Sequence, residues 1–223
     1  MVISDQLKKI YECKLKSISR VYNGIDITYR PDKNDPSIIA QINKFRDLNY
    51  KIIGSYAYLT RIKGLEQLIK VLEKRKDLAV VIIGEGEAKN ELIELSRTLN
   101  VIDRTLFLDY LPTPYNYLSL FDVYAMCSRS EGFGLAAVEA TLMQTPVVCS
   151  NISIFKEIFD DTKVSFFELD NISSLLESIN IAISTIGKLK AKVALNYSLN
   201  NFSGYKMASN YLDIYSNLLN GKI

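Results

Sequence analysis

The chain has 223 residues, of which 48% are hydrophobic and 23% charged, a composition typical of one globular domain or two small ones. Its 27 basic and 25 acidic residues nearly balance, which argues against nucleic-acid binding as its main task. The absence of histidine excludes Ser-His-Asp and Cys-His nucleophiles, HExxH zinc sites and the commonest general base near neutral pH.

No segment of the sequence predicts passage through a membrane. The longest unbroken apolar run, residues 78–83, is too short to cross a bilayer, and the residues after Met1 turn polar at once, so no signal peptide is expected. The cysteines Cys13, Cys127 and Cys149 are odd in number and far apart, which excludes a disulfide framework. We therefore expect a reducing, cytoplasmic location.

The first 50 residues show no regular hydrophobic period. The pair Asn23-Gly24 and the step Asp35-Pro36 are turn signals, and the whole stretch 30–36 is rich in turn residues. We therefore expect irregular structure in this part of the chain.

From residue 51 onward, short apolar runs alternate with segments of helical periodicity. The apolar runs, many of them β-branched, predict six strands at residues 51–58, 78–83, 105–108, 123–127, 146–149 and 164–167. Apolar residues at helical spacing predict helices around Leu68, Leu95 and Leu142, and Ser174-x-x-Glu177 is interpreted as the capping box of a fourth. Buried strands separated by helices predict an α/β fold with a Rossmann-like, doubly wound parallel sheet.

After Gly187 the sequence predicts helices only. The last of them carries apolar residues on a single stripe, including Tyr205, Leu212 and Leu219, and such a stripe needs a surface on which to lie. We therefore expect a helical extension beyond the sheet.

Ligands of open parallel sheets bind beyond the carboxyl ends of the strands, so the strand-to-helix turns are the candidate sites. Arg61 and Lys63 precede the helix after the first strand, where two cations could clamp an anion, although a solvated basic turn fits equally well. The turn Gly84-Glu-Gly86 lacks the third small residue of a phosphate fingerprint and is interpreted as a tight turn. Residues 109–112 could present their backbone to a base or form an ordinary loop.

The turn after the fourth strand carries the strongest signal. Residues 128–139 read SRSEGFGLAAVE, in which two glycines let backbone amides approach a ligand at the positive end of the next helix. Glu139 follows the apolar Val138, a place better suited to binding hydroxyls than to contact with solvent. With Glu131 in the loop ahead, this turn suits a polyhydroxylated, phosphorylated ligand.

Two other interpretations of this turn stay open. Gly132-x-Gly134-x-x-Ala137 satisfies a loose dinucleotide fingerprint, although it follows the fourth strand rather than the first, and would indicate a dinucleotide-binding oxidoreductase. Glu131 alone also fits a helix N-terminus at which an acid complements the helix dipole.

The motif Ser128-x-x-Glu131-Gly-Phe-Gly-Leu-x-x-x-Glu139, followed by Thr145-Pro-Val-Val, resembles the E-x7-E signature of the retaining glycosyltransferases of family 4, which have the GT-B fold. Further segments similar to that family occur in the expected order along the chain, at residues 21–26, 59–64, 83–86, 107–112 and 201–215. The resemblance covers essentially the whole chain.

The resemblance implies a role for each matching residue. Lys63 and Glu131 are expected at the reacting centre, where Lys63 neutralises the donor diphosphate and Glu131 holds the donor sugar. The backbone at Tyr110 and Leu111 is expected to hold the base, and Glu139 the ribose hydroxyls.

The remaining donor contacts follow from the same resemblance. The amides of Phe133, Gly134 and Leu135 are expected beside the sugar and its phosphate, and Arg61 and Gly86 complete the donor site. The family generally acts without a metal, so no metal or other cofactor is expected, and cations and helix dipoles stabilise the leaving diphosphate. In such retaining enzymes that diphosphate is thought to help deprotonate the acceptor, a step that needs no histidine.

Three positions depart from the family pattern. Tyr58 stands where an arginine usually precedes the lysine by five residues, Asp109 replaces a glycine before the base-binding backbone, and Gln144 replaces another glycine. With Tyr58 in place of that arginine, the alternatives are that Arg61 reaches the diphosphate instead or that donor binding is weak. The acceptor-binding N-terminal domain of the family has no counterpart in this sequence, so the chain is expected to be roughly half of the enzyme.

The resemblance thus implies one half of a GT-B fold. Residues 1–26 are expected to be an interdomain crossover, 27–200 a nucleotide-sugar-binding domain, and 201–223 a helix that packs back on the missing domain. The predicted function is retaining transfer of a hexose from a nucleotide sugar to a glycan or lipid-linked glycan, held by an N-terminal domain or partner subunit. A subunit of a split transferase and a degenerate, non-catalytic module are the alternatives, and peripheral membrane association is compatible with the cytoplasmic location.

Overall fold

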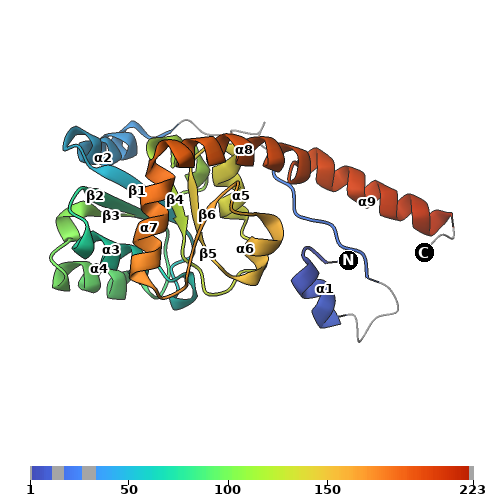
Figure 1. Ribbon diagram of the computed structural model, residues 1–223, viewed down its shortest axis with the longest axis horizontal. Helices are drawn as coiled ribbons and strands as arrows, with labels where there is room; N and C mark the ends of the chain where they lie inside the picture. Colours follow the sequence, from blue (N-terminus) through green and yellow to red (C-terminus); the bar gives the residue numbers. More distant parts are fainter. Residues whose placement is uncertain (1, 12–17, 27–33, 221–223) are drawn as a thin grey trace.

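The computed structural model describes residues 2–11, 18–26 and 34–220. Most of the predicted turn-rich stretch 30–36 therefore lies outside the described residues. Six parallel strands form one sheet in the order β3-β2-β1-β4-β5-β6 (Figure 1). They are β1 (Lys51–Tyr56), β2 (Leu78–Ile83), β3 (Thr105–Leu108), β4 (Val123–Met126), β5 (Val147–Ser150) and β6 (Ser165–Phe167). Each lies within two residues of its predicted range, and the prediction of a doubly wound α/β sheet is confirmed.

The strand β2 illustrates why these apolar runs form the sheet. All six of its residues are buried, because β2 lies between β1 and β3 and is covered on both faces. Its side chains alternate between two cores: Ala79, Val81 and Ile83 join one, whereas Val80 and Ile82 join the other. A strand buried in this way needs a continuous apolar run.

Helices cover both faces of the sheet (Figure 1). One face packs against α3 (Glu66–Lys74), α4 (Lys89–Thr98) and α7 (Ile172–Ile183), and the other against α2 (Pro36–Asp47), α5 (Leu135–Leu142) and α6 (Ser153–Ile158). The helix α8 (Thr185–Asn201) packs on α5 and α7. The helix α9 (Gly204–Leu219) continues from α8 as an arm that leaves the body of the molecule and has no buried residue. A short helix, α1 (Asp5–Tyr11), and three 3-10 turns, η1 (Arg61–Lys63), η2 (Ile102–Arg104) and η3 (Pro114–Leu120), complete the fold.

Residues 21–26 run extended beside the junction of α8 and α9. Ile25 exchanges two backbone hydrogen bonds with this junction. A Cβ atom at Gly24 would lie 2.3 Å from Ser203 O, so the close approach of two backbones requires glycine there. The predicted turn at Asn23-Gly24 is therefore wrong.

The helix α2 corrects the expectation of irregular structure before residue 51. Asp35 is its N-cap and accepts a hydrogen bond from Ser37 N–H at 2.8 Å, and Pro36 occupies its first position. Ile38 and Ile42 lie one turn apart and are buried against the sheet. The Asp-Pro step therefore starts a helix instead of forming a turn.

The structure also corrects the start of α7. Asn171 is its N-cap, and the Asn171 side chain accepts a hydrogen bond from Ser174 N–H at 3.0 Å. Ser174 lies inside the first turn, where its hydroxyl accepts a hydrogen bond from Glu168 N–H at 2.9 Å. Glu177 is therefore not at the position that a capping box requires.

Arg104, in η2, is a buried cation held by backbone oxygens. Its side chain donates to the carbonyls of Leu72, Arg75 and Leu78 at 2.8–3.0 Å, and only 5% of the residue is exposed. Leu72 lies in the last turn of α3, so the guanidinium also faces the negative end of that helix dipole. Arg104 thereby joins the end of α3 to the start of β2.

We predict that Arg104→Met destabilises the fold by about 2–4 kcal/mol, because buried carbonyls lose their charged donor. Urea unfolding should show a lower midpoint with an unchanged slope. Arg97→Met is the matched control, since Arg97 is exposed on α4 and forms a surface pair with Glu94, which contributes less than about 1 kcal/mol. Equal losses in the two variants would contradict the role assigned to Arg104.

Candidate active site

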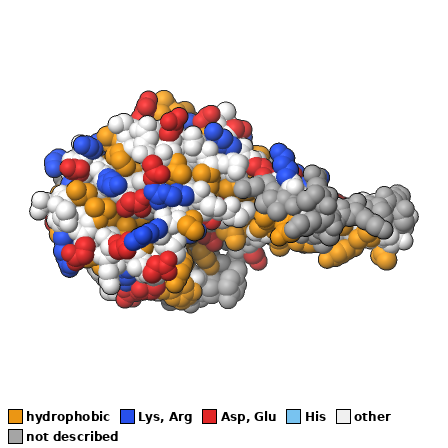
Figure 2. Space-filling view, turned by 90° about the horizontal axis from the view of Figure 1, so that it is seen from below, with side chains coloured by type: hydrophobic (Ala, Val, Ile, Leu, Met, Phe, Trp, Pro, Cys, Tyr) orange, Lys and Arg blue, Asp and Glu red, His pale blue; other side chains and the backbone are white. Residues whose placement is uncertain are grey.

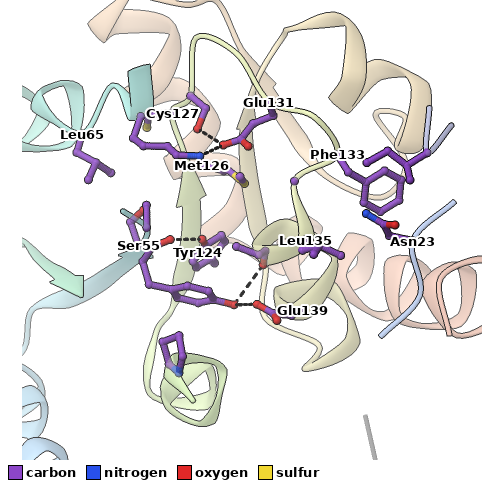
Figure 3. Close-up of a pocket in the computed structure, with 18 residues that line it drawn as sticks. Asn23, Ser55, Leu65, Tyr124, Met126, Cys127, Glu131, Phe133, Leu135 and Glu139 are labelled. Atoms are coloured by element: carbon purple, nitrogen blue, oxygen red, sulfur yellow. Dashed lines mark hydrogen bonds and ion pairs between the residues drawn. The ribbon is translucent and has the colours of Figure 1, made fainter. Parts of the chain in front are cut away.

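A cavity of about 480 Å³ lies beyond the carboxyl ends of β1 and β4. The strand order reverses between these two neighbours, so the connections that follow them run to opposite faces of the sheet and leave a crevice. The lining comes from the ends of both strands, the connection from β1 to α3 with Lys63 and Leu65, the loop before α5 and α5 itself. Pro114 and, from the N-terminal part of the chain, Ile3 and Asn23 complete it (Figure 3).

Lys63 and Glu131 form an ion pair in this cavity. Lys63 ends η1, the turn between β1 and α3, and Glu131 lies in the loop between β4 and α5. Lys63 Nζ lies 2.6 Å from Glu131 Oε1, and Ser128 Oγ donates to the same oxygen at 2.7 Å (Figure 3). The two charged side chains are 24% and 11% exposed, so solvent screens them less than it screens a surface pair. The structure thus brings together the two residues expected at the reacting centre.

Arg129, which no sequence signal singles out, joins the turn to the loop. Its N–H donates to Ile62 O at 2.8 Å, and its guanidinium donates to Arg61 O at 2.8 Å and to the Glu66 carboxylate at 2.6 Å. The two segments that carry the ion pair are thereby held together. Because two of these partners are backbone carbonyls, the contacts leave no residue pattern that could have revealed them.

The start of α5 brings backbone N–H groups to the cavity. Gly134 is the N-cap with φ 87°, and a Cβ atom there would lie 2.4 Å from the Phe155 ring, so glycine is required. Among the described residues, no hydrogen bond within the chain uses the N–H groups of Phe133, Gly134 or Leu135. These donors and the positive end of the helix dipole suit an anion.

Phe133 anchors this loop in an aromatic cluster. Its ring centre lies 5.7 Å from that of Tyr22 and 5.6 Å from that of Phe202, and only 3% of the residue is exposed. Tyr22 belongs to the extended N-terminal segment, and Phe202 follows the end of α8. The backbone donors at the start of α5 are therefore fixed by packing against both segments.

Glu139, on α5, is a half-buried carboxylate. The Tyr56 hydroxyl donates to Glu139 Oε2 at 2.5 Å (Figure 3). Burial raises the pKa of the Glu139 carboxyl above its ordinary value, and the hydrogen bond from Tyr56 opposes part of that rise. A half-buried carboxylate at the edge of a cavity is well suited to accept hydrogen bonds from hydroxyl groups.

A second cavity, of about 420 Å³, adjoins the first. The two share the lining residues Tyr56, Ala57 and Pro114. Tyr110 and Leu111, in the loop after β3, line only the second cavity. The residues expected to hold a base therefore lie in the second cavity and those expected to hold a diphosphate in the first, and the two cavities share three lining residues.

Arg61 and Gly86, which are expected in the donor site, do not line the first cavity, and neither does Tyr58, which departs from the family pattern. Tyr58 borders the second cavity and is 65% exposed. Arg61 pairs with Glu91 at 2.7 Å on the surface and lines neither cavity. Gly86 packs against the backbone of Leu59 and also lines neither. The roles of the site residues in donor binding stay predictions.

Three residues that no sequence signal assigns to a ligand also line the cavity, namely Tyr56, Ser128 and Asn23. Tyr56 is the last residue of β1, and the rule that ligands bind beyond the carboxyl ends of strands could have identified it. Ser128 stands within the quoted motif. Asn23 reaches the cavity from a segment distant in sequence, which no local pattern reveals.

Across the described ranges, no group of three His, Cys, Asp or Glu side chains is arranged to hold a metal ion. The expectation that no metal takes part stays a prediction. In the same part of the chain, no helix combines the length and the apolar character that crossing a membrane requires.

We predict that Glu139→Gln stabilises the folded chain at pH 7. The folded pKa of Glu139 is raised, so its contribution to stability is complete below the unfolded value of 4.5 and is lost as the pH rises through the folded value. The free energy of unfolding of the variant should exceed that of the unaltered chain at pH 7 and approach it below pH 4. Urea titrations at the two pH values measure this difference, and a variant equally destabilised at both would contradict the prediction.

Known proteins are similar to this chain in sequence and in fold. A family model described as "Glycosyl transferases group 1" matches residues 38–194. The O-antigen biosynthesis glycosyltransferase WclY of Escherichia coli is 35% identical over 202 residues, which are 89% of this chain and 55% of that protein. An N-acetylgalactosamine-N,N'-diacetylbacillosaminyl-diphospho-undecaprenol 4-alpha-N-acetylgalactosaminyltransferase of Campylobacter jejuni is 29% identical over 178 residues, 78% of this chain and 47% of that protein.

The chain spans about half the length of the curated relatives it matches. Among solved structures, Anabaena HepE in complex with UDP and glucose superposes with a TM-score of 0.83 at 21% identity, over 98% of this chain and 62% of that one. This likeness confirms the fold as the Rossmann-like half of a GT-B architecture. The chain belongs to the group 1 family of glycosyl transferases.

Proposed function

We propose that this chain is the donor-binding half of a retaining glycosyltransferase and that its ligand is a nucleotide-diphosphate sugar. One observation carries the proposal: a single cavity is bordered by a lysine, a helix N-terminus with free N–H groups and two carboxylates, and a second cavity adjoins it. A sugar nucleotide has matching parts in the same order, namely sugar, diphosphate, ribose and base.

The diphosphate would lie between the Lys63 ammonium and the N–H groups of Gly134 and Leu135. Lys63 would exchange one oxygen of Glu131 for a phosphate oxygen, which keeps the cation paired throughout. Glu131, once released, would accept hydrogen bonds from the hydroxyls of the donor sugar, beside the N–H of Phe133. The ion pair between Lys63 and Glu131 thus keeps both charges in contact until a ligand replaces that contact.

The nucleoside would extend from the first cavity into the second. Glu139 would bind the ribose hydroxyls, and the backbone at Tyr110 and Leu111 would hold the base. The exposed ring of Tyr58 borders the same second cavity. At the other end, a Cβ atom at Gly132 would meet no described atom within 4 Å, so the space that this glycine leaves is available to a ligand.

The proposed reaction breaks the bond between the anomeric carbon and the diphosphate oxygen, which keeps the electron pair. A bond forms between that carbon and an acceptor hydroxyl on the same face, and the hydroxyl proton passes to the departing diphosphate. Lys63 and the positive end of α5 would stabilise the negative charge that develops on the diphosphate. This route needs no histidine, and we propose no metal or other cofactor for it.

Arg61 and Gly86 have lesser roles in this proposal. Arg61 would contact the diphosphate only after leaving Glu91, with which it pairs on the surface. Gly86 would act through the backbone of Leu59, which it lies against. Lys63 is therefore the cation to which we assign the diphosphate.

The acceptor side is proposed to belong to a further domain or to a partner subunit. The arm α9 supports this, because Tyr205, Leu212 and Leu219 are 85%, 64% and 88% exposed, and hydrophobic side chains gather along it (Figure 2). We propose that residues 1–26 connect the two domains and that residues 201–223 pack on the other one. An exposed apolar helix of this kind needs a covering surface.

The biological setting is proposed from the relatives. One is named for O-antigen biosynthesis and another for transfer to a diphospho-undecaprenol glycan. We propose that this chain likewise serves the assembly of a surface glycan, with a glycan or lipid-linked acceptor, at the cytoplasmic side of a membrane.

Calorimetric titration of the chain with UDP, GDP and nicotinamide adenine dinucleotide tests the donor proposal. We expect one nucleoside diphosphate to bind, and its Kd to rise about tenfold or more in Lys63→Ala, since a charged hydrogen bond contributes about 1.5–3 kcal/mol. Glu139→Ala should weaken the same nucleotide by a similar factor. Lys70→Ala removes an exposed lysine from α3 and should leave the Kd unchanged.

The other outcomes separate the alternatives. Preferred binding of the nicotinamide dinucleotide would favour the dinucleotide interpretation of Gly132-x-Gly134-x-x-Ala137. Absence of binding by all three compounds would favour a degenerate module. A nucleoside diphosphate whose affinity is unchanged in both site variants would contradict the placement of the donor.

A further inference from the structure

Tyr56 is a buried residue at the boundary of both cavities that has no role in the donor site described above. It ends β1, is 8% exposed, and lines the first and the second cavity. A ribose that joins a base in one cavity to a diphosphate in the other must pass this boundary. Tyr56 therefore lies where the nucleoside would bend from one cavity to the other.

The Tyr56 hydroxyl has one proton and two acceptors within reach. Glu139 Oε2 lies 2.5 Å away, and Ala136 O lies 3.5 Å away, so the proton goes to the carboxylate. The geometry is that of a short hydrogen bond to a charged oxygen, the stronger class of such bonds. Tyr56 thus fixes one oxygen of Glu139.

Tyr124 fixes Tyr56 in turn. The Tyr124 hydroxyl donates to Tyr56 O at 3.3 Å, and the two ring centres are 5.0 Å apart. Tyr124 is fully buried in β4, the strand next to β1 (Figure 3). The Tyr56 side chain is therefore supported by the sheet itself and not by a loop.

The second oxygen of Glu139 is left for a ligand. Among the described residues no hydrogen bond reaches Glu139 Oε1, although Glu139 lines the first cavity. A carboxylate with one oxygen anchored loses little rotational freedom when the other binds, which is a gain from preorganisation. Without the hydrogen bond from Tyr56, the Glu139 carboxylate could rotate about its side-chain bonds.

We propose that Tyr56 is a positioning residue that holds Glu139 by one oxygen so that the other recognises the ribose hydroxyls of the donor nucleotide. This inference rests on the proposed function, since it takes the ligand to be a ribonucleoside diphosphate. Through Tyr56, the end of β1 contributes to the selection of ribose over sugars that lack the ribose hydroxyls.

Tyr56→Phe removes a single oxygen atom and tests the inference by calorimetry. The probes are UDP and GDP, each compared with its 2′,3′-dideoxy analogue, on the 223-residue chain. We expect the unaltered chain to prefer the ribonucleotide, and Tyr56→Phe to weaken the ribonucleotide about tenfold while changing the Kd of the dideoxy analogue less than about twofold. In a Glu139→Gln background, Tyr56→Phe should cause no further loss of the preference.

Tyr117→Phe is the matched control. Tyr117 is also a buried tyrosine, 5% exposed, and its hydroxyl accepts a hydrogen bond from Asp35 N–H at 2.9 Å, away from both cavities. It should lower stability without altering the ratio of the two affinities. Equal weakening of both nucleotides by Tyr56→Phe would overturn the inference, because a merely structural role acts on both.

The inference and the function on which it rests fail in different ways. If the unaltered chain binds neither UDP nor GDP, the donor proposal is overturned and the inference with it. If the chain binds one of them and the preference for ribose survives in Tyr56→Phe, only the inference is overturned.

Discussion

The adjacency of β1 and β4 is the constraint on which the rest of the structure depends. β1 pairs in parallel with β2 on one side and β4 on the other, so the connections that follow β1 and β4 leave toward opposite faces of the sheet. The space between them cannot be filled by either connection. Lys63 follows β1, and Glu131 and Glu139 follow β4, so this one feature of the topology gathers all three.

Charged groups gathered in such a crevice must be satisfied without a ligand. Lys63 and Glu131 neutralise each other, and Tyr56 donates to Glu139, whose pKa burial raises. Arg129 holds the two segments around the ion pair together through backbone carbonyls. The site is therefore internally paired, and a phosphate oxygen can take the place of Glu131 on Lys63 while Tyr56 keeps its contact with Glu139.

The sheet could be predicted from the sequence because a continuous apolar run between two helices has few structures open to it other than a buried strand. The helix α2 could not, because Asp35-Pro36 is both a turn signal and the usual start of a helix. Glycine is required at position 24 because the backbone of Ser203, which is remote in sequence, packs against it in the fold. In the site, the motifs pointed to Lys63, Glu131 and Glu139, which line the first cavity, whereas Tyr56 meets Glu139 through one hydroxyl contact that no spacing encodes.

A crystal structure of the chain with bound UDP or GDP, whichever calorimetry selects, tests the central claim most directly. We predict a diphosphate within hydrogen-bond distance of Lys63 Nζ and of the N–H groups of Gly134 and Leu135, with the ribose on Glu139 and the base beside Tyr110. A nucleotide whose base instead occupies the start of α5, or one bound outside both cavities, would contradict the assignment of this crevice to the donor.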